Sequence, residues 1–202
     1  MSSALSDYLE QIDESTSWDE EEFLQTKILE LANVDPKAFI REVRAIPADD
    51  LVWLSDVYEA LSYDAEHWEN FFVEEVDRLL QLARDSDQPS DVLFPLNAYF
   101  QLSLDDEIDQ LQERLRKKFY DNVEDENVFI RRKCVVLLGD FIGRKSFKAL
   151  NKLERLANSD PDWRVRYLAY EALLEAVPER KKRVKLPRWI RIRGWLSKYD
   201  LE

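Results

Sequence analysis

Reactive side chains are few in this chain of 202 residues, which contains one cysteine, Cys134, and one histidine, His67. A catalytic thiolate must be exposed and lie beside a basic group. Cys134 instead occupies a small, tightly packed position of the repeat described below, and we expect a buried structural thiol. His67 has no second histidine or cysteine with which to complete a metal site, so we expect a surface or capping role for it. No metal ion is therefore expected to bind.

Paired carboxylates can act as a general acid and base, but they are too numerous here to single out one pair. Most of them fall at predicted helix starts, where negative charge complements the helix dipole. These groups are Glu20-Glu21-Glu22, Asp49-Asp50, Glu74-Glu75 and Asp105-Asp106-Glu107. The three glycines lack the spacing of a phosphate-binding loop. We therefore expect neither a catalytic residue nor a cofactor.

Composition indicates a single folded domain, residues 1–202. Hydrophobic residues make up 45% of the chain and aromatic residues 12%, which is enough for a packed core. The 3 glycines and 7 prolines are too few for most loop-rich β folds. No run approaches the roughly 20 apolar residues of a membrane span, and the first residues lack the features of a signal peptide. We expect a cytoplasmic protein without integral membrane association, and one cysteine fits a reducing compartment.

Charge is divided unevenly along the chain, whose formal net charge is −13. Residues 1–112 include 6 basic and 28 acidic residues, whereas residues 113–202 include 23 basic and 14 acidic ones. This asymmetry favours a charged partner, because the acidic half attracts basic proteins and repels nucleic acid. The basic half would do the reverse. The alternative is that both sets of charges are solvated helix faces that keep the protein in solution.

Apolar residues recur at helical spacing along the chain, and about ten helices are predicted. Two stripes have gaps of three and four residues, which place the members of each stripe on one helix face. They are Trp68, Phe72, Val76, Leu79 and Ala83, and Ile108, Leu111, Leu115 and Phe119. Ser17 followed by Glu20 predicts a capping box, and Asp35-Pro36 places proline at a first helical position. Short links predict antiparallel helix hairpins.

The second half of the chain contains a repeat with an offset of 35 residues. The matched residues are Asp125 with Asp160, Ile130-Arg131 with Val165-Arg166, Cys134 with Ala169, and Leu138 with Leu173. A further helix, predicted from Ser146 to Asn158, lies between the two copies. A repeated helix pair of this length is typical of an α-solenoid, in which pairs stack because one pair cannot bury its apolar stripe alone.

This region resembles the HEAT-repeat family in its short bacterial-type variant, and the resemblance covers residues 121–177. It rests on an aspartate followed five residues later by Val/Ile-Arg, then a small residue, then leucine. It extends to the segment 138–143, Leu-Gly-Asp-Phe-Ile-Gly, which is similar to the turn between the two helices of a repeat, and to apolar positions in 149–156. Arg144 departs from the acidic residue common in the family. The resemblance implies an all-α fold, a right-handed α-solenoid of antiparallel helix pairs, in which Asp125, Arg131 and their counterparts tie repeats together.

We divide the domain into acidic N-terminal helices at 1–48, stacked helix pairs at 49–177 and a basic C-terminal segment with a capping helix at 178–202. The helix pattern alone suggests further pairs upstream of the repeat. These are Leu51–Leu61 with Ala65–Ala83, and Asp91–Leu102 with Asp105–Phe119.

In HEAT-like folds the second helices line the concave surface, which implies where a partner would lie. The charge of this concave surface is expected to change from acidic at one end to basic at the other. Its candidate contacts are Glu69, Glu74, Asp77, Lys148, Lys152 and Arg155. We expect a non-catalytic protein-binding scaffold or inhibitor that holds another protein, with a basic surface, in this groove. An immunity protein against a basic toxin is one example.

Other functions remain open at this stage. The main alternative is nucleic-acid binding through the basic half, as in the HEAT-like DNA glycosylases, which this chain resembles in fold only. Head-to-tail self-association of the oppositely charged ends is another alternative, and an enzyme-associated HEAT protein of the chromophore-lyase kind is a third.

The C-terminal segment combines cations with large apolar side chains. Residues 180–185 are similar to a nuclear import signal, which is a weak pattern. One face of the next predicted helix collects Trp189, Ile192, Leu196 and Tyr199, with Arg188, Arg191 and Lys198 away from it. We expect this helix to cap the stack, and Arg188 and Arg191 are further candidate contacts for the partner. The alternatives are phosphate binding or a membrane-surface helix.

Overall fold

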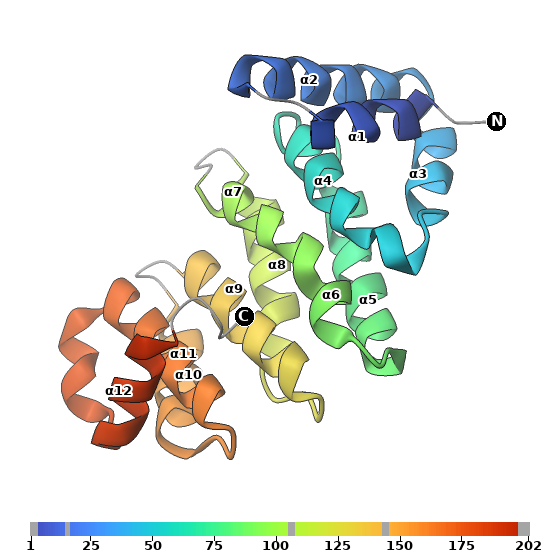
Figure 1. The fold of residues 1–202 in the computed structure, drawn as a ribbon. Helices are drawn as coiled ribbons and strands as arrows, with labels where there is room; N and C mark the ends of the chain where they lie inside the picture. The colour runs from blue at the N-terminus through green and yellow to red at the C-terminus, as the bar shows by residue number, and fades with distance from the viewer. Residues whose placement is uncertain (1–3, 15–16, 105–107, 143–145, 198–202) are drawn as a thin grey trace.

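The computed structural model describes residues 4–14, 17–104, 108–142 and 146–197, and these residues form helices joined by loops, with no β-strand among them (Figure 1). The predicted all-α class is therefore confirmed. The α-helices are α1 (Ala4–Glu14), α2 (Trp18–Val34), α3 (Pro36–Arg44), α4 (Leu54–Ser62), α5 (Glu69–Asp85), α6 (Pro89–Leu93), α7 (Tyr99–Ser103), α8 (Asp109–Asn122), α9 (Val128–Ile142), α10 (Phe147–Ser159), α11 (Trp163–Ala176) and α12 (Arg188–Leu196). Between them lie the 3₁₀ helices η1 (Ala48–Trp53), η2 (Phe94–Ala98) and η3 (Pro178–Arg183).

Two predicted helix starts are confirmed by their capping contacts. The Ser17 hydroxyl accepts a hydrogen bond from the backbone N–H of Glu20 at 3.3 Å, at the start of α2. The Asp35 carboxylate accepts one from the N–H of Ala38 at 3.0 Å, and Pro36 is the first residue of α3. Such contacts satisfy N–H groups that have no acceptor within the first turn of a helix.

Three predicted boundaries are wrong. Residues 138–142, expected in a turn from the resemblance to HEAT repeats, are instead the last residues of α9, and residue 143 lies outside the described residues. Helix α5 begins at Glu69 and not at Ala65, because the residues before it form a turn closed by hydrogen bonds to the Asp64 carbonyl. The helix predicted over 91–102 is divided into α6, η2 and α7. Pro95 lies in η2 and lacks the N–H that an α-helix would use, so the chain tightens there into 3₁₀ turns.

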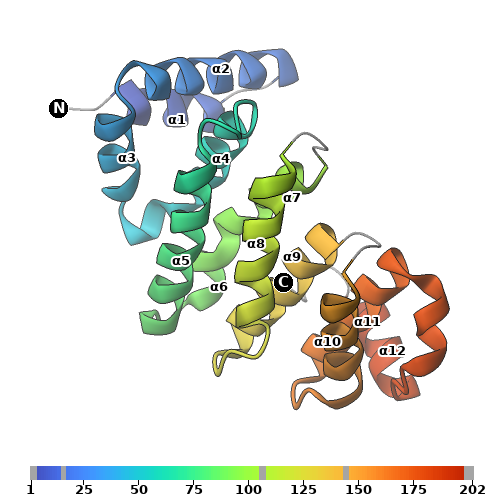
Figure 2. The ribbon, with the colours of Figure 1, turned by 180° about the vertical axis from the view of Figure 1, so that it is seen from behind.

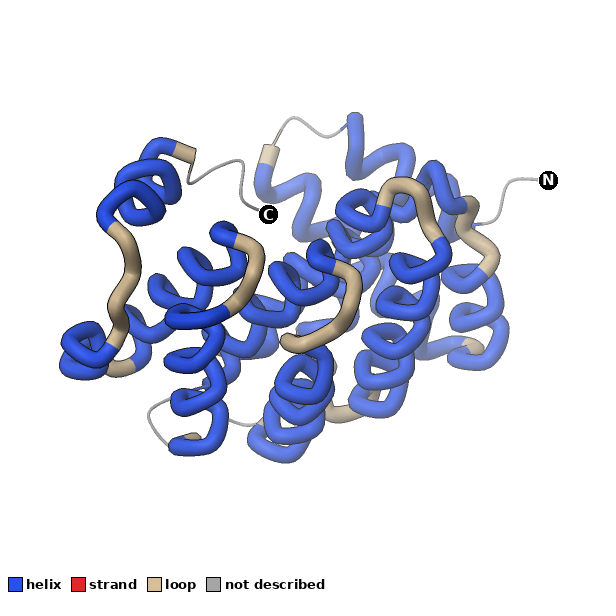
Figure 3. The backbone as a smooth tube through the Cα atoms, turned by 90° about the horizontal axis from the view of Figure 1, so that it is seen from below, coloured by secondary structure: helices blue, strands red, loops and turns tan. Residues whose placement is uncertain are grey.

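The helices between residues 54 and 176 form two layers. Figure 1 shows α4, α6, α9 and α11 on the near side, and Figure 2, seen from behind, shows α5, α8 and α10 side by side. Packing contacts join α5 to α8, α9 to α11, and, between the layers, α8 to α9 and α10 to α11. Helices α1 to α3 lie at one end of this arrangement and α12 at the other. Figure 3 shows that short loops connect most of the helices.

The two predicted apolar stripes are buried in one continuous core. The core also contains an aromatic group formed by Tyr58, Phe72 and Tyr99, whose ring centroids lie 5.4 to 6.3 Å apart. The Tyr99 hydroxyl donates a hydrogen bond to the Phe72 carbonyl at 2.8 Å, so its polar end is satisfied within the core. These residues fasten α4, α5 and α7 to one another.

The 35-residue repeat recurs in the structure, since α9 begins at Val128 and α11 begins at Trp163. The matched apolar and small positions are all buried. They are Ile130 and Val165, Cys134 and Ala169, and Leu138 and Leu173. The two helices approach closely at Gly139, where an added Cβ atom would lie 2.7 Å from the Cβ atom of Ala172. A larger residue at position 139 therefore requires α9 or α11 to shift.

The turn before each of these helices has the same hydrogen bond. The carboxylates of Asp125 and Asp160 each accept one, at 2.8 Å, from the backbone N–H two residues further on. Arg131 in α9 ties the copies together, because its Nε lies 3.3 Å from a carboxylate oxygen of Asp160. Arg84 in α5 forms the equivalent ion pair with Asp125 at 2.7 Å. Each aspartate is thus bound by an arginine from an earlier part of the chain.

We predict that Gly139→Ala lowers the free energy of unfolding by about 1–3 kcal/mol, because the overpacked contact outweighs the better helix propensity of alanine. Ala172→Gly alone should cost about 1 kcal/mol through its poorer propensity. The double variant removes the clash, so its loss should be smaller than the sum of the two single losses. Urea denaturation of the four proteins measures this coupling, and strictly additive losses would contradict the close contact.

Candidate binding site

The predicted acidic residues of α5 lie in ion pairs with neighbouring helices. Glu69 pairs with Arg114 of α8 at 2.6 Å, and Asp77 pairs with Lys118 of the same helix. Glu74 pairs with Arg44 of α3 at 2.9 Å. These carboxylates therefore hold α5 between α3 and α8, and each already has a partner within the chain.

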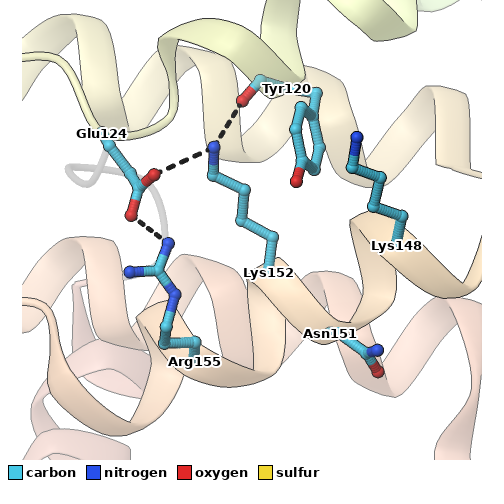
Figure 4. Close-up of a pocket in the computed structure, with 6 residues that line it drawn as sticks. All are labelled: Tyr120, Glu124, Lys148, Asn151, Lys152 and Arg155. Atoms are coloured by element: carbon cyan, nitrogen blue, oxygen red, sulfur yellow. Dashed lines mark hydrogen bonds and ion pairs between the residues drawn. The ribbon is translucent and has the colours of Figure 1, made fainter.

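The predicted basic residues of α10 meet the end of α8. The Lys152 ammonium donates hydrogen bonds to the Glu124 carboxylate and to the Tyr120 carbonyl, each at 3.0 Å, and Arg155 pairs with the other Glu124 oxygen (Figure 4). The Tyr120 ring lies between two ammonium groups, with Lys152 Nζ 4.1 Å and Lys148 Nζ 5.2 Å from its centroid. The structure thus brings together three of the predicted site residues.

Local structure explains why these cations share one side of α10. Lys148, Lys152 and Arg155 are spaced by four and three residues, which places them on one face of a helix. The opposite face carries Leu150 and Leu153, which are buried in the core. The helix begins after Ser146, whose hydroxyl accepts a hydrogen bond from the N–H of Ala149 at 3.4 Å. Packing of the apolar face therefore fixes the direction in which the cations point.

An open pocket of about 380 Å³ lies between α8 and α10. It is lined by Tyr120, Glu124, Lys148, Asn151, Lys152 and Arg155. Three cations and one carboxylate give it a net positive charge, so it suits a carboxylate or phosphate group beside an aromatic ring. Glu124 holds two of the cations in place, which lowers the conformational entropy lost when an anion binds.

Two smaller hollows lie on the same layer. One, of about 220 Å³, shares Tyr120 and Lys148 with the pocket and reaches Arg116 and Lys117 of α8. The other, of about 230 Å³, lies between α5 and α8 and is lined in part by Glu69. The layer of α5, α8 and α10 is therefore hollowed on both sides of α8.

No protein-family model, curated protein or solved structure matches this chain. The contacts of its own residues therefore supply the argument for a site.

Sequence reasoning missed Tyr120, Glu124 and Asn151. Tyr120 follows the buried Phe119 and carries an aromatic ring near the end of α8, but no sequence signal shows which helix lies beside that end. Glu124 lies in the turn after α8, outside the helical stripes. Only the contacts of the α10 side chains with the end of α8 show that these residues are neighbours of the predicted cations.

Glu75, one of the paired carboxylates, is fully buried and has a structural role. It accepts hydrogen bonds from Arg44 Nε at 2.9 Å, from Arg78 Nε at 2.7 Å and from the Tyr58 hydroxyl at 3.0 Å. Burial, together with the charge of Glu75, raises the pKa of the Tyr58 phenol well above its ordinary value. This network joins α3, α4 and α5 in the core.

The remaining candidates lie apart from the pocket. Cys134 is buried, as expected, and burial raises the pKa of its thiol well above the ordinary range. His67 is exposed, in agreement with the expected surface role. Arg188 and Arg191 are exposed on α12 at the far end of the molecule, whereas Tyr199 and Lys198 lie outside the described residues.

Within the ranges given above, no group of three or more histidine, cysteine, aspartate or glutamate side chains is placed to hold a metal ion. Within the same ranges, no helix has the length and apolar character needed to cross a bilayer.

We predict that Glu124 stabilises the seam between α8 and α10 in a pH-dependent way. The hydrogen bond from Lys152, aided by Arg155 and opposed by partial burial, holds the pKa of the Glu124 carboxyl below its ordinary 4.5. Its contribution should be present above that pH and be lost as the pH falls through the lower, folded-state pKa. Glu124→Gln should therefore lower the free energy of unfolding by about 0.5 kcal/mol at neutral pH, with the deficit disappearing in acid.

Urea denaturation from neutral to strongly acidic pH measures the difference in free energy of unfolding between wild type and Glu124→Gln. Glu126→Gln, in the same exposed turn, serves as the control for loss of one charge. A deficit of Glu124→Gln that is equal at neutral and strongly acidic pH would contradict the ion-pair explanation.

Proposed function

We propose that this chain is a non-catalytic protein-binding scaffold or inhibitor whose partner lies on the layer of α5, α8 and α10. The observation that carries the proposal is the open, cationic pocket around Tyr120, flanked by hollows on the same layer. Hollowed surfaces with an aromatic side chain and pre-positioned arginine and lysine groups are typical of energetically important contacts between proteins.

We further infer that the two layers are those of a right-handed α-solenoid of the HEAT type. Three repeated features support this inference: the 35-residue spacing of α9 and α11, the matched buried positions, and the aspartate turns tied by Arg84 and Arg131. In such a solenoid the second helices of each pair line the concave side. On this basis α5, α8 and α10 would form the inner, partner-facing layer.

The charge of the surface suggests the chemistry of the partner. A carboxylate of the partner would enter the pocket between Lys148 and Arg155, whereas a basic surface would lie against the acidic end formed by α1 and α2. The partner would therefore have a basic surface, as expected from the sequence, and would also carry an acidic group that contacts α10. Opposite charges on α10 and on α1 and α2 would orient the partner during encounter and exclude proteins with the reverse pattern. An inhibitor of a basic toxin, of the immunity type, fits this description.

We predict that Lys148→Glu weakens partner binding at least about tenfold, because it reverses a charge at the pocket mouth. Lys148 is exposed, so the substitution should leave the thermal unfolding midpoint nearly unchanged. Lys37→Glu on α3 changes the net charge equally at an exposed site outside the pocket and is the matched control. The measurement is quantitative capture from the native host by the three immobilised proteins, followed by titration with the purified captured protein.

A partner that binds wild type and Lys37→Glu alike, but loses affinity for Lys148→Glu, supports the proposal. A partner bound equally by all three proteins would contradict the pocket as its site. Recovery of no protein that binds after purification would contradict the scaffold function itself.

Nucleic-acid binding is the second candidate, and one observation favours it. The Tyr120 ring between Lys148 and Lys152 resembles the stacking platforms that hold single-stranded bases beside backbone phosphates. Against it, Glu124 neutralises part of this charge, and the acidic half would repel a long polyanion. We therefore place it second.

Fluorescence anisotropy with single-stranded RNA and duplex DNA at low and high salt separates the two functions. The scaffold proposal predicts no saturable binding even at low salt. Binding that weakens steeply with added salt and is lost in Lys148→Glu would instead establish the nucleic-acid function.

A further inference from the structure

Helix α12 turns large apolar side chains toward solvent. Trp195 is 73% exposed, Leu196 69%, Trp189 54% and Ile192 50%. A helix turns by about 100° per residue, so these four residues form one continuous outward arc. Single exposed apolar residues are common on proteins, but four within a nine-residue helix form a patch that marks an interaction surface.

The opposite side of α12 is fixed against α11. An added Cβ atom at Gly194 would lie 2.2 Å from the Tyr167 ring, so this glycine allows the backbone of α12 to rest directly on that ring. Ile190 is fully buried on the same side. Arg193 reaches back over the Trp163 ring, with its guanidinium carbon 4.6 Å from the centroid. The apolar arc is therefore held outward by packing.

Positive charge surrounds this arc. Arg191 lies at one edge of the arc and Arg193 at the other. Arg188, which was expected away from the apolar face, lies within the arc instead. Residues 180–197 contain eight lysines and arginines and no aspartate or glutamate, although the whole chain has a net charge of −13. The exposed cations of this segment include Lys182, Arg183 and Lys185 just before α12. The surface is thus both apolar and strongly cationic.

We propose that α12 binds peripherally to anionic lipid bilayers and lies in the plane of the membrane surface. Tryptophan, leucine and isoleucine side chains would enter the boundary between headgroups and acyl chains. The flanking arginines would keep their guanidinium groups among the lipid phosphates while their stems lie along the apolar boundary. An anionic bilayer complements this face in both respects, since its acyl boundary accepts the exposed apolar side chains and its phosphates pair with the exposed arginines.

The position of α12 makes such contact compatible with an acidic protein. The acidic helices α1 and α2 lie at the opposite end of the molecule (Figure 1). Charges separated from the bilayer by more than about 8–10 Å are largely screened at physiological salt. The inference goes beyond the proposed scaffold function, because the pocket between α8 and α10 and the face of α12 are separate surfaces.

Co-sedimentation of the full chain with lipid vesicles tests the proposal. We expect binding to vesicles of phosphatidylcholine mixed with phosphatidylserine, little binding to phosphatidylcholine alone, and weakening by added salt. Trp195→Ala/Leu196→Ala should lower the partition coefficient at least about tenfold, because it removes most of the inserted apolar area. Arg191→Glu should lower it at least about fivefold.

The control variants are Trp18→Ala, which truncates an equally exposed tryptophan of α2, and Lys37→Glu, which changes the same charge on α3. Both should bind vesicles as wild type does, and all variants should keep the wild-type unfolding midpoint because the changed side chains are exposed. No binding to anionic vesicles at low salt would overturn the proposal, as would binding that the α12 variants retain. Loss of an acidic protein partner by the α12 variants, without vesicle binding by wild type, would also overturn it and assign this face to that protein.

Discussion

Ion pairs between neighbouring helices determine how the layer of α5, α8 and α10 fits together. Asp77 of α5 pairs with Lys118 of α8, and Glu124 after α8 pairs with Arg155 of α10. Each exposed pair adds little to the free energy of unfolding, which comes mostly from the apolar core. Displacing a helix by one turn, however, would break several pairs at once, so together they select one register. Much of the uneven charge along the chain is therefore used within the molecule.

The helices could be predicted because their signals are local. A stripe of apolar residues or a capping serine acts within a few turns, and the repeated aspartate turns recur at a fixed offset. Pro95 is a local signal that the helix prediction did not use, because a pattern of apolar residues does not record a missing backbone N–H.

Only part of the candidate site could be predicted from the sequence. Spacing places three cations on one face of α10, but Glu124 is 31 residues from Arg155, and the sequence does not show that α8 lies beside α10. For the same reason the acidic residues of α5 were expected to face a partner, whereas the structure pairs them with α3 and α8.

The two proposed surfaces differ in the way they are built. The pocket between α8 and α10 is polar, and its Lys152 and Arg155 groups are already restrained by Glu124, so it is suited to recognising one anionic group in a defined position. The face of α12 is apolar and cationic, and nothing in it defines a single orientation for a ligand. If both proposals hold, selectivity would belong to the first surface, and the second would control where in the cell the first is presented.

The close approach of Gly139 to Ala172 makes adjacent seams of the molecule unequal in stiffness. Between α9 and α11, Gly139 leaves room for only the Ala172 methyl group, so the helices cannot move closer together at that point. Between α8 and α10, on the layer behind, the contact is made by the Lys152, Arg155 and Glu124 side chains, whose ion pairs can break without displacement of either helix. The width of the pocket can consequently change by rotation of side chains while α9 and α11 keep their spacing. The seam between α9 and α11 is therefore held by close backbone approach, and the seam between α8 and α10 by side chains.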